Sequence, residues 1–238
     1  MKNLLLICIF LLSVIVVKAQ PKGDYYKINI YHTTSKAQLD SLDDYLQNTF
    51  VPKVHKMGIS KVGVFHPIAN DTSADKRIVV WLPLKTFNQA TEFMPDPSAA
   101  KYKRMESILL SAFPDALHYQ LPDLKGNKQD HIYELRSYEG PTEERYISKV
   151  KMFNAGGEVK LFKRLNFNAV FYASVIAGSH MPNLMYLTSF DDMASHDAHW
   201  KAFGNDAEWK HLNTFAEYSG NVSHADIILM HAAPYSDF

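Results

Sequence analysis

An internal repeat of about 107 residues constrains the fold of this chain more than any other feature of its sequence. Residues 26–31 are similar to residues 133–138, because both segments have tyrosines at their ends and alternating inner residues. This alternation is typical of a strand that buries one face. Two further strand-like segments recur in the same order at nearly the same spacing: 59–70 with 167–178, and 77–82 with 183–188. The repeat predicts a structural unit that occurs twice.

Helices are predicted between these strands, where apolar residues recur every three or four positions. Ser35 and Thr142 are candidate N-caps, and a break in the second half is expected at Gly156 and Gly157. The expected helices are residues 36–57 and 86–111 in the first half, and residues 142–165 and 192–219 in the second.

Each half then reads strand, helix, strand, strand, helix, strand, which is the pattern of a ferredoxin-like module. The closing strands are expected at residues 117–121 and 226–231. The predicted fold is α+β, with one module at 24–122, a polar linker, and a second module at 131–238. Each module leaves one sheet face bare, so we expect the two sheets to pair into a pseudo-dimeric α/β barrel. Closure within one chain predicts a monomer, and closure between chains predicts a homodimer.

The N-terminus resembles a cleaved signal peptide over residues 1–19. Lys2 is followed by an apolar run over residues 4–17, and Val17 and Ala19 stand three and one positions before the expected cut. An uncleaved anchor is the alternative, but this run is shorter than the roughly 20 residues that span a bilayer. We therefore predict export, periplasmic or secreted, with no membrane span after cleavage.

Composition excludes several functional classes. The single cysteine, Cys8, lies in the predicted signal peptide, so the mature chain is expected to have no disulfide, thiolate ligand or cysteine nucleophile. Lysine and arginine total 25, as do aspartate and glutamate, so no basic surplus favours nucleic-acid binding. The sequence also has no glycine-rich phosphate loop and no G-x-S-x-G motif.

A set of motifs recurs in one order along the second half. Residues 132–138 read Ile-Tyr-Glu-Leu-Arg-Ser-Tyr, an apolar strand at 183–187 leads into a helix, and Trp200 precedes an Asp-Ala-Glu-Trp turn that ends at Trp209. Together these motifs resemble the NIPSNAP family over residues 132–212, and the first half resembles it only through the repeat. Two positions depart from the family pattern: Ala207 replaces the usual proline, and Asn29 occupies the position of the arginine in the first half.

The resemblance implies a dimeric α/β-barrel architecture and little specific chemistry. The wider barrel superfamily includes cofactor-independent oxygenases, isomerases and haem-binding enzymes, which use the space between the sheet and the helices. Any reaction transferred from that superfamily rests on fold similarity alone.

The strand at 132–138 carries the most chemically suggestive pattern. Glu134, Arg136 and Tyr138 are expected on one face, and Tyr133 is expected on the other. Arg136 and Tyr138 are suited to binding a carboxylate or an enolate. The alternative is a structural Glu134–Arg136 ion pair at the interface between the two modules, and we favour it.

Histidines and aromatic residues complete the candidate sites. His32, His66 and His180 stand at predicted strand ends, where a general base or a haem ligand is often placed. His196 and His199 lie three residues apart on a predicted helix, as for a clipped metal ion, although a hydrated helix face is the favoured interpretation. The candidate ligand-binding residues, for which core packing is the alternative, are Tyr133, Glu134, Tyr172, Trp200 and Trp209.

Two functional hypotheses follow. The favoured one is an exported protein that binds a small apolar molecule or a protein partner. The alternative is a cofactor-independent oxygenase or isomerase acting on an enolisable or aromatic small molecule, with Arg136, Tyr138 and His180 as catalytic residues. Neither a resident cofactor nor a metal is predicted.

Overall fold

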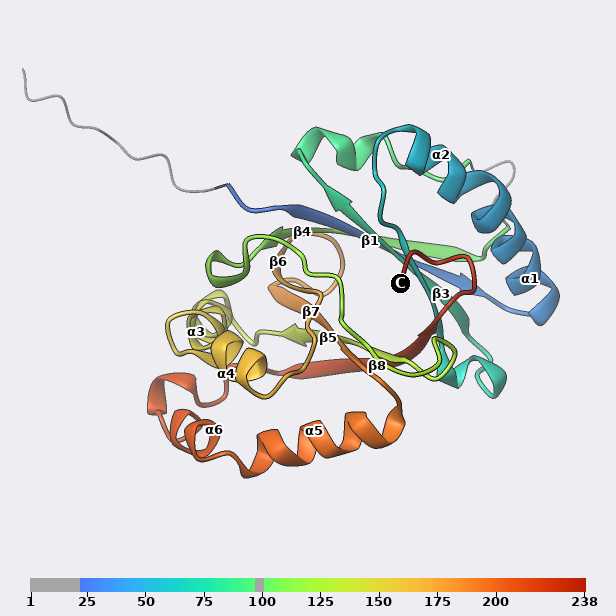
Figure 1. Cartoon of the computed structure of the whole chain (residues 1–238). Helices are drawn as coiled ribbons and strands as arrows, with labels where there is room; N and C mark the ends of the chain where they lie inside the picture. Colours follow the sequence, from blue (N-terminus) through green and yellow to red (C-terminus); the bar gives the residue numbers. More distant parts are fainter. Residues whose placement is uncertain (1–21, 97–100) are drawn as a thin grey trace, which may run out of the picture.

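Eight antiparallel strands close into a single barrel, and the helices pack on its outside (Figure 1). The computed structural model describes residues 22–96 and 101–238. The predicted signal peptide at 1–19 lies outside the described residues. Within them, every helix is too short or too polar to cross a bilayer.

Each half contributes four strands to the barrel. The strand order around it is β1-β3-β2-β8-β5-β7-β6-β4. The strands are β1 (Tyr25–Thr33), β2 (Gly63–Pro67), β3 (Lys76–Leu84), β4 (Arg104–Ala112), β5 (Ile132–Glu139), β6 (Phe171–Ala177), β7 (Asn183–Phe190) and β8 (His224–Ala232).

Two seams join the halves. At one seam β2 pairs with β8, with Phe65 opposite Ala232, and at the other β4 pairs with β6, with Ala112 opposite Ala173. These pairings leave no strand edge free, because every strand has two neighbours in the ring. The predicted pseudo-dimeric barrel is confirmed, and it closes within one chain.

The helices begin and end largely where local signals place them. Ser35 caps α1 by accepting from the Gln38 backbone N–H, and Thr142 caps α3 in the same way from Arg145. Gly157, at a φ of +90°, separates α3 from α4. The helices are α1 (Lys36–Tyr45), α2 (Val51–Lys56), α3 (Glu143–Phe153), α4 (Glu158–Arg164), α5 (Met193–Asn205) and α6 (Ala207–Leu212), with a π-helical turn at Leu46–Phe50 that joins α1 to α2.

The prediction for residues 86–121 was wrong in two respects. The expected helix over 86–111 is instead a short 3₁₀ turn, η3 (Phe87–Thr91), followed by β4, and the expected strand at 117–121 is irregular. The segment that forms β4 has apolar residues at both helical and strand spacing. Pairing decides the outcome, because β4 fills the gap between β1 and β6 that would otherwise leave the barrel open.

Three large apolar clusters result from this arrangement. The barrel interior is filled by inward side chains of both halves, among them Tyr26, Trp81, Tyr133 and Phe238. A second cluster lies between the first-half strands and α1–α2, and a third lies between the second-half strands and α3–α5. The other end of the barrel is polar and is described below.

Candidate functional site

The outward side chains of β5 form a chain of polar contacts beneath α5. Arg136 Nε donates to Glu134 Oε1 at 2.8 Å, and Arg136 Nη1 donates to the Tyr138 hydroxyl at 2.9 Å. The guanidinium also stacks on the ring of Trp200, 3.7 Å from its centroid, and Trp200 Nε1 donates to Glu134 Oε2 at 2.6 Å. Tyr138 in turn shares a hydrogen bond of 2.8 Å with Tyr186.

This network uses all three guanidinium nitrogen atoms of Arg136. Nη2 lies 2.7 Å from Glu134 Oε1, and the Glu134 side chain is only 1% exposed. Burial acts against the charged guanidinium, but the adjacent phenols and the Glu134 carboxylate outweigh it, so the pKa of Arg136 lies above its ordinary value. The favoured ion pair is therefore present. It lies between the sheet and α5 within the second half, whereas it was predicted at the interface between the two modules.

A second buried ion pair lies near this network. Lys149 of α3 donates to Glu158 Oε2 at 2.9 Å, and both side chains are almost fully buried. Burial raises the pKa of Glu158, and the neighbouring Lys149 opposes that rise. The Lys149 ammonium also lies 4.7 Å from the ring centroid of Phe153. This pair was not predicted, because its members lie on different helices, on either side of the glycine break.

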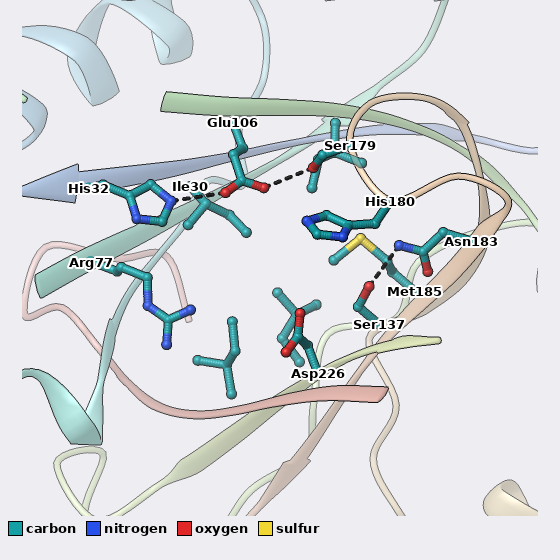
Figure 2. Close-up of a pocket in the computed structure, with 13 residues that line it drawn as sticks. Ile30, His32, Arg77, Glu106, Ser137, Ser179, His180, Asn183, Met185 and Asp226 are labelled. Atoms are coloured by element: carbon teal, nitrogen blue, oxygen red, sulfur yellow. Dashed lines mark hydrogen bonds and ion pairs between the residues drawn. The ribbon is translucent and has the colours of Figure 1, made fainter. Parts of the chain in front are cut away.

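The polar end of the barrel holds a cavity that both halves line (Figure 2). It encloses about 490 Å³, including the part that is open to solvent. Its floor is made of apolar side chains, among them Ile30, Leu135 and Ile228. The polar lining residues are His32, Arg77 and Glu106 from the first half, and Ser137, Ser179, His180, Asn183 and Asp226 from the second.

Hydrogen bonds order the first-half wall of this cavity. Glu106 Oε2 accepts from the Ser179 hydroxyl at 2.8 Å, and Glu106 Oε1 accepts from Arg104 Nη1 at 2.6 Å and lies 3.1 Å from His32 Nε2. Burial favours protonated Glu106, but hydrogen bonds from Ser179 and Arg104 outweigh it and lower the pKa of the carboxyl. The other ring nitrogen of His32, Nδ1, lies 2.9 Å from Asp75 Oδ2. Glu106 was not among the predicted site residues, because its strand was predicted as a helix.

A larger groove lies between α4, the segment after β4, and the start of β6. It encloses about 1200 Å³, including open solvent. Phe162, Val159 and Tyr172 form its apolar wall together with Leu117 and Val170. Polar residues stand at its rim, namely Asp115, His118, Gln120, Lys163, Asn166 and Asn168.

The structure does not bring the three predicted catalytic residues together. Arg136 and Tyr138 lie on the outer face of β5. His180 lies at the cavity mouth, with its Nδ1 2.8 Å from Glu139 Oε1. One small molecule bound to Arg136 beneath α5 is therefore separated from His180 by the sheet itself. Their catalytic roles stay a prediction.

The predicted ligand-binding residues are divided among three places. Tyr133 points into the barrel, where burial raises its pKa to about 12. Glu134 and Trp200 belong to the network beneath α5. Trp209 packs on Phe203, and Tyr172 lines the groove.

The other histidines that the sequence predicts as site residues have separate partners. His66 Nε2 lies 2.9 Å from Asp43 Oδ1, on the outside of the first half. On α5, His196 Nδ1 lies 2.9 Å from Asp197 Oδ1, whereas His199 Nδ1 lies 2.7 Å from the carbonyl oxygen of Ser195. His32 and His180 are the two of these predicted strand-end histidines that meet at one cavity.

The sequence of the second half matches a known family over almost its whole length. The NIPSNAP family model covers residues 133–237, which runs from β5 to the end of the barrel. The second half is a NIPSNAP domain. The predicted resemblance is thus confirmed for this half, and the first half lies outside the matched residues. No curated protein matches the chain in sequence.

Solved structures share the fold of the entire barrel. A monooxygenase-like protein from Lactobacillus acidophilus NCFM has a TM-score of 0.59 at 9% identity, over 89% of this chain and 94% of that one. An anthrone oxidase-like protein has a TM-score of 0.53 at 7% identity, over 91% and 94% of the two chains. A mutant chlorite dismutase from Candidatus Nitrospira defluvii has a TM-score of 0.51 at 8% identity, over 89% and 91%. At these identities the similarity establishes the dimeric α/β-barrel fold and no activity.

Proposed function

We propose that this protein binds a small, largely apolar molecule in the groove beside Tyr172. The observation that carries the proposal is the groove itself, with an aromatic and aliphatic wall and a polar rim. Small-molecule sites in proteins usually combine such a wall with a few polar groups that orient the ligand. The NIPSNAP domain and the shared barrel fold support a role in binding small molecules, and the lining favours an apolar one.

The wall of the groove is built from aromatic rings that contact one another. Phe162 contacts the Tyr172, Phe167 and Phe203 rings, at centroid distances between 4.7 and 5.9 Å. Burial holds the pKa of Tyr172 well above its ordinary value, so the wall stays neutral at physiological pH. An uncharged aromatic wall favours apolar ligands, because no ion has to lose its hydration when the ligand binds.

Filling the groove tests the proposal directly. Ala169 lines the groove, and Ala169→Trp places a large ring in the space that a ligand would occupy. Ala198→Trp, on the exposed face of α5, is the matched control. The probe is 8-anilinonaphthalene-1-sulfonate, whose fluorescence rises on transfer to an apolar site. We expect saturable binding that Ala169→Trp weakens at least tenfold, which corresponds to a loss of about 1.4 kcal/mol or more in binding free energy, and that the control preserves.

The native mass of the protein as purified from cells provides the second readout. A reproducible added mass that disappears in Ala169→Trp and persists in Ala198→Trp supports the proposal. Equal dye affinity in both variants contradicts it, provided that both retain the melting temperature of the parent protein.

We also propose that the chain is exported and that the mature protein begins near Gln20. The support is the charged, apolar and small-residue order of residues 1–19. N-terminal sequencing of the protein recovered from a cell envelope extract tests it. A start at Gln20 supports cleavage, and an intact Met1 contradicts it.

A further inference from the structure

Three potential metal ligands meet where β5 ends and β8 begins, at the open end of the barrel. Glu139 is the last residue of β5 and lies directly opposite His224 of β8 in the strand register. Asp226 follows His224 by two positions on the same strand, so both side chains point to the same side of the sheet. The barrel thus brings together residues that are far apart in the sequence.

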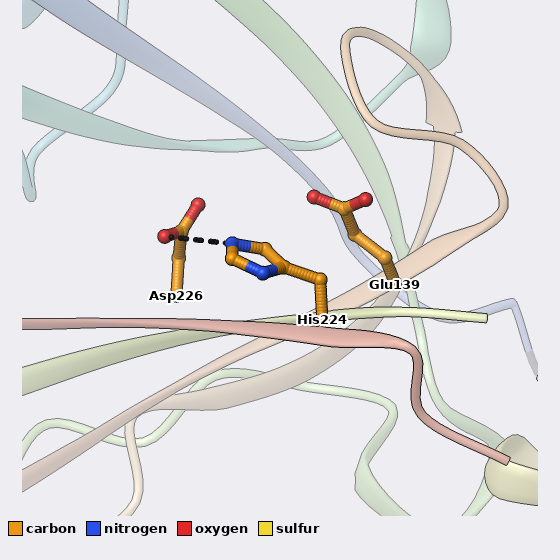
Figure 3. Close-up of side chains that lie close together, drawn as sticks. All are labelled: Glu139, His224 and Asp226. Carbon is orange, nitrogen blue, oxygen red and sulfur yellow. Dashed lines mark hydrogen bonds and ion pairs between the residues drawn. The ribbon is translucent and has the colours of Figure 1, made fainter. Parts of the chain in front are cut away.

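The side-chain geometry is compact. One donor atom from each of Glu139, His224 and Asp226 lies within 4.8 Å of the other two. Figure 3 shows the imidazole ring of His224 between the two carboxylates. His224 Nε2 lies 3.3 Å from Asp226 Oδ1. Donor atoms at this separation surround a single ion when each moves slightly towards it.

We propose that Glu139, His224 and Asp226 bind a divalent transition-metal ion at the mouth of the barrel. The donor set of one imidazole and two carboxylates suits zinc and its first-row neighbours. An imidazole nitrogen disfavours magnesium and calcium, which take oxygen ligands. Such a metal site goes beyond the groove function and departs from the sequence prediction, which included no metal.

His180 supports Glu139 from outside the donor set. Its Nδ1 lies 2.8 Å from Glu139 Oε1. Hydrogen-bond partners of this kind orient a ligating carboxylate and tune its affinity for the metal. We assign His180 as a positioning residue, which leaves Glu139 Oε2 for the ion.

A second, independent feature points to a missing partner at this place. Asn183 lies opposite Glu139 on the other neighbouring strand, β7, and lines the cavity together with Asp226 and His180. The residue is 2% exposed, and its Oδ1 has no hydrogen-bond partner although its Nδ2 donates to Ser137 at 2.7 Å. A buried amide oxygen without a donor is costly, so Asn183 is a polar group at this end of the barrel whose partner the described residues do not supply.

The ion would also have open coordination positions. The described part of the chain provides three protein ligands, and the His224 and Asp226 side chains are more than half exposed. Solvent therefore reaches the ion, and water fills its remaining positions. An ion at this point lies beside the cavity of Figure 2, because Asp226 belongs to both sites.

Isothermal titration calorimetry with Zn²⁺, on the full chain without a histidine tag, tests the site. We expect one ion per chain and no detectable heat with Mg²⁺ under the same conditions. His224→Gln and Asp226→Asn each remove one donor and should weaken Zn²⁺ binding about 100-fold or more. Because both side chains are exposed, neither change should alter the melting temperature of the metal-free protein.

The matched control is His55→Gln. His55 also pairs with a carboxylate, at 2.8 Å from Asp237, but no third ligand is grouped with it among the described residues. The control should bind Zn²⁺ as tightly as the parent protein. Absence of Zn²⁺ binding to the parent, or an equal loss in His55→Gln and His224→Gln, overturns the proposal.

The positioning role of His180 has its own readout. Co²⁺ bound in place of Zn²⁺ reports its ligands through its visible absorption spectrum. His180→Gln should weaken binding about tenfold and leave the Co²⁺ spectrum unchanged, because the directly bound atoms stay the same. A changed spectrum would mean that His180 is itself a ligand and would overturn its assignment as a positioning residue.

Discussion

The two halves of the barrel share an interior and differ in what covers them. Tyr26 and Tyr133, like Ile28 and Leu135, occupy matching positions on β1 and β5, and all four fill the barrel interior. The outward rows of the same strands diverge, because Asn29 in the first half stands where Arg136 stands in the second. Inward positions must pack against both halves, whereas outward positions need only suit their own helices.

The coverings differ in the same way. In the second half α5, 13 residues long, lies over the polar network, and α6 follows it. In the first half the connection between β3 and β4 contains the five-residue turn η3. Lys27 of β1 reaches into this connection, where its ammonium donates to the carbonyl oxygens of Ala90 at 2.7 Å and Phe93 at 3.3 Å. The Lys27 ammonium, bonded to backbone carbonyls, thus takes the place in the first half that the Glu134–Arg136 ion pair beneath α5 has in the second.

The largest expected effect tests whether the Arg136 network is structural. Arg136→Met leaves the buried Glu134 carboxylate without its cation and should lower the free energy of unfolding by about 3–5 kcal/mol. Asn29→Leu, the matched change in the first half, should cost less than about 1 kcal/mol, because the Asn29 Oδ1 already lacks a partner. Urea unfolding measures both. An unchanged stability in Arg136→Met would contradict the structural role and favour the catalytic one.

The second effect concerns the Lys149–Glu158 pair. Lys149→Met leaves Glu158 buried and unpaired, and should cost about 3 kcal/mol at pH 7. Burial already raises the pKa of Glu158 in the folded state, and removal of Lys149 raises it further. An unpaired buried carboxyl destabilises the protein most when it is ionised. The difference in the free energy of unfolding between parent and variant should therefore shrink as the pH falls towards 4.5.

Urea unfolding of the Lys149 variant between pH 4.5 and 8 gives the result. The double variant Lys149→Met with Glu158→Leu removes both charges and should recover most of the stability. A deficit that does not change with pH would show that lost packing, and not the unpaired carboxylate, causes the destabilisation.

A smaller effect is expected from Lys27, the first-half counterpart of Glu134. Burial lowers the pKa of Lys27 below its ordinary 10.5. Between that lowered pKa and 10.5 the unfolded chain binds more protons than the folded chain, so stability rises with pH through this window. Lys27→Met should remove the rise while changing stability at pH 7 by about 1 kcal/mol or less. Urea unfolding of the parent and the variant, measured at several pH values above 8, checks this prediction. An equal dependence of the free energy of unfolding on pH in the two proteins would contradict it.

The smallest expected effects come from the N-terminal caps of α5 and η3. Asp192 caps α5 by accepting from the Ser195 backbone N–H at 2.7 Å, so Asp192→Ala should cost about 1 kcal/mol. Thr86 and Gln89 form a capping box at η3, but Thr86→Ala should cost only a few tenths of a kcal/mol, because the element it caps is a single short turn. Thermal unfolding of both variants distinguishes them, and equal losses would mean that η3 contributes as much stability as α5.

Local sequence signals predicted most of the second half and less of the first. The caps at Ser35 and Thr142, the break at Gly157 and the alternation along β5 were all readable, because each depends on neighbours within a few residues. The strand β4 was not predicted, because the spacing of its apolar residues suits a helix as well. Its pairing with β1 and β6 decides that it forms a strand. For the same reason Glu106 escaped notice as a cavity residue.

The sites were less predictable than the elements. Periodicity correctly separated Tyr133 from Arg136, because the two faces of a strand follow from its geometry. It did not show that His180 belongs with Glu139 and Asp226, or that Tyr172 borders a groove with Leu117. Those groupings depend on which strands lie side by side, and sequence spacing carries no information about that.

The sequence by itself determined the repeat, the alternating strands and the pairing of two modules, because a sheet with one bare apolar face must be covered. Tertiary structure alone decided that the barrel closes through β4–β6 and β2–β8 within one chain, and which polar residues meet at its open end. Hydrophobic periodicity is a property of one segment. Which residues of distant segments lie side by side is a property of the closed barrel. Once the last two strand edges pair, the register of every strand in the ring is fixed.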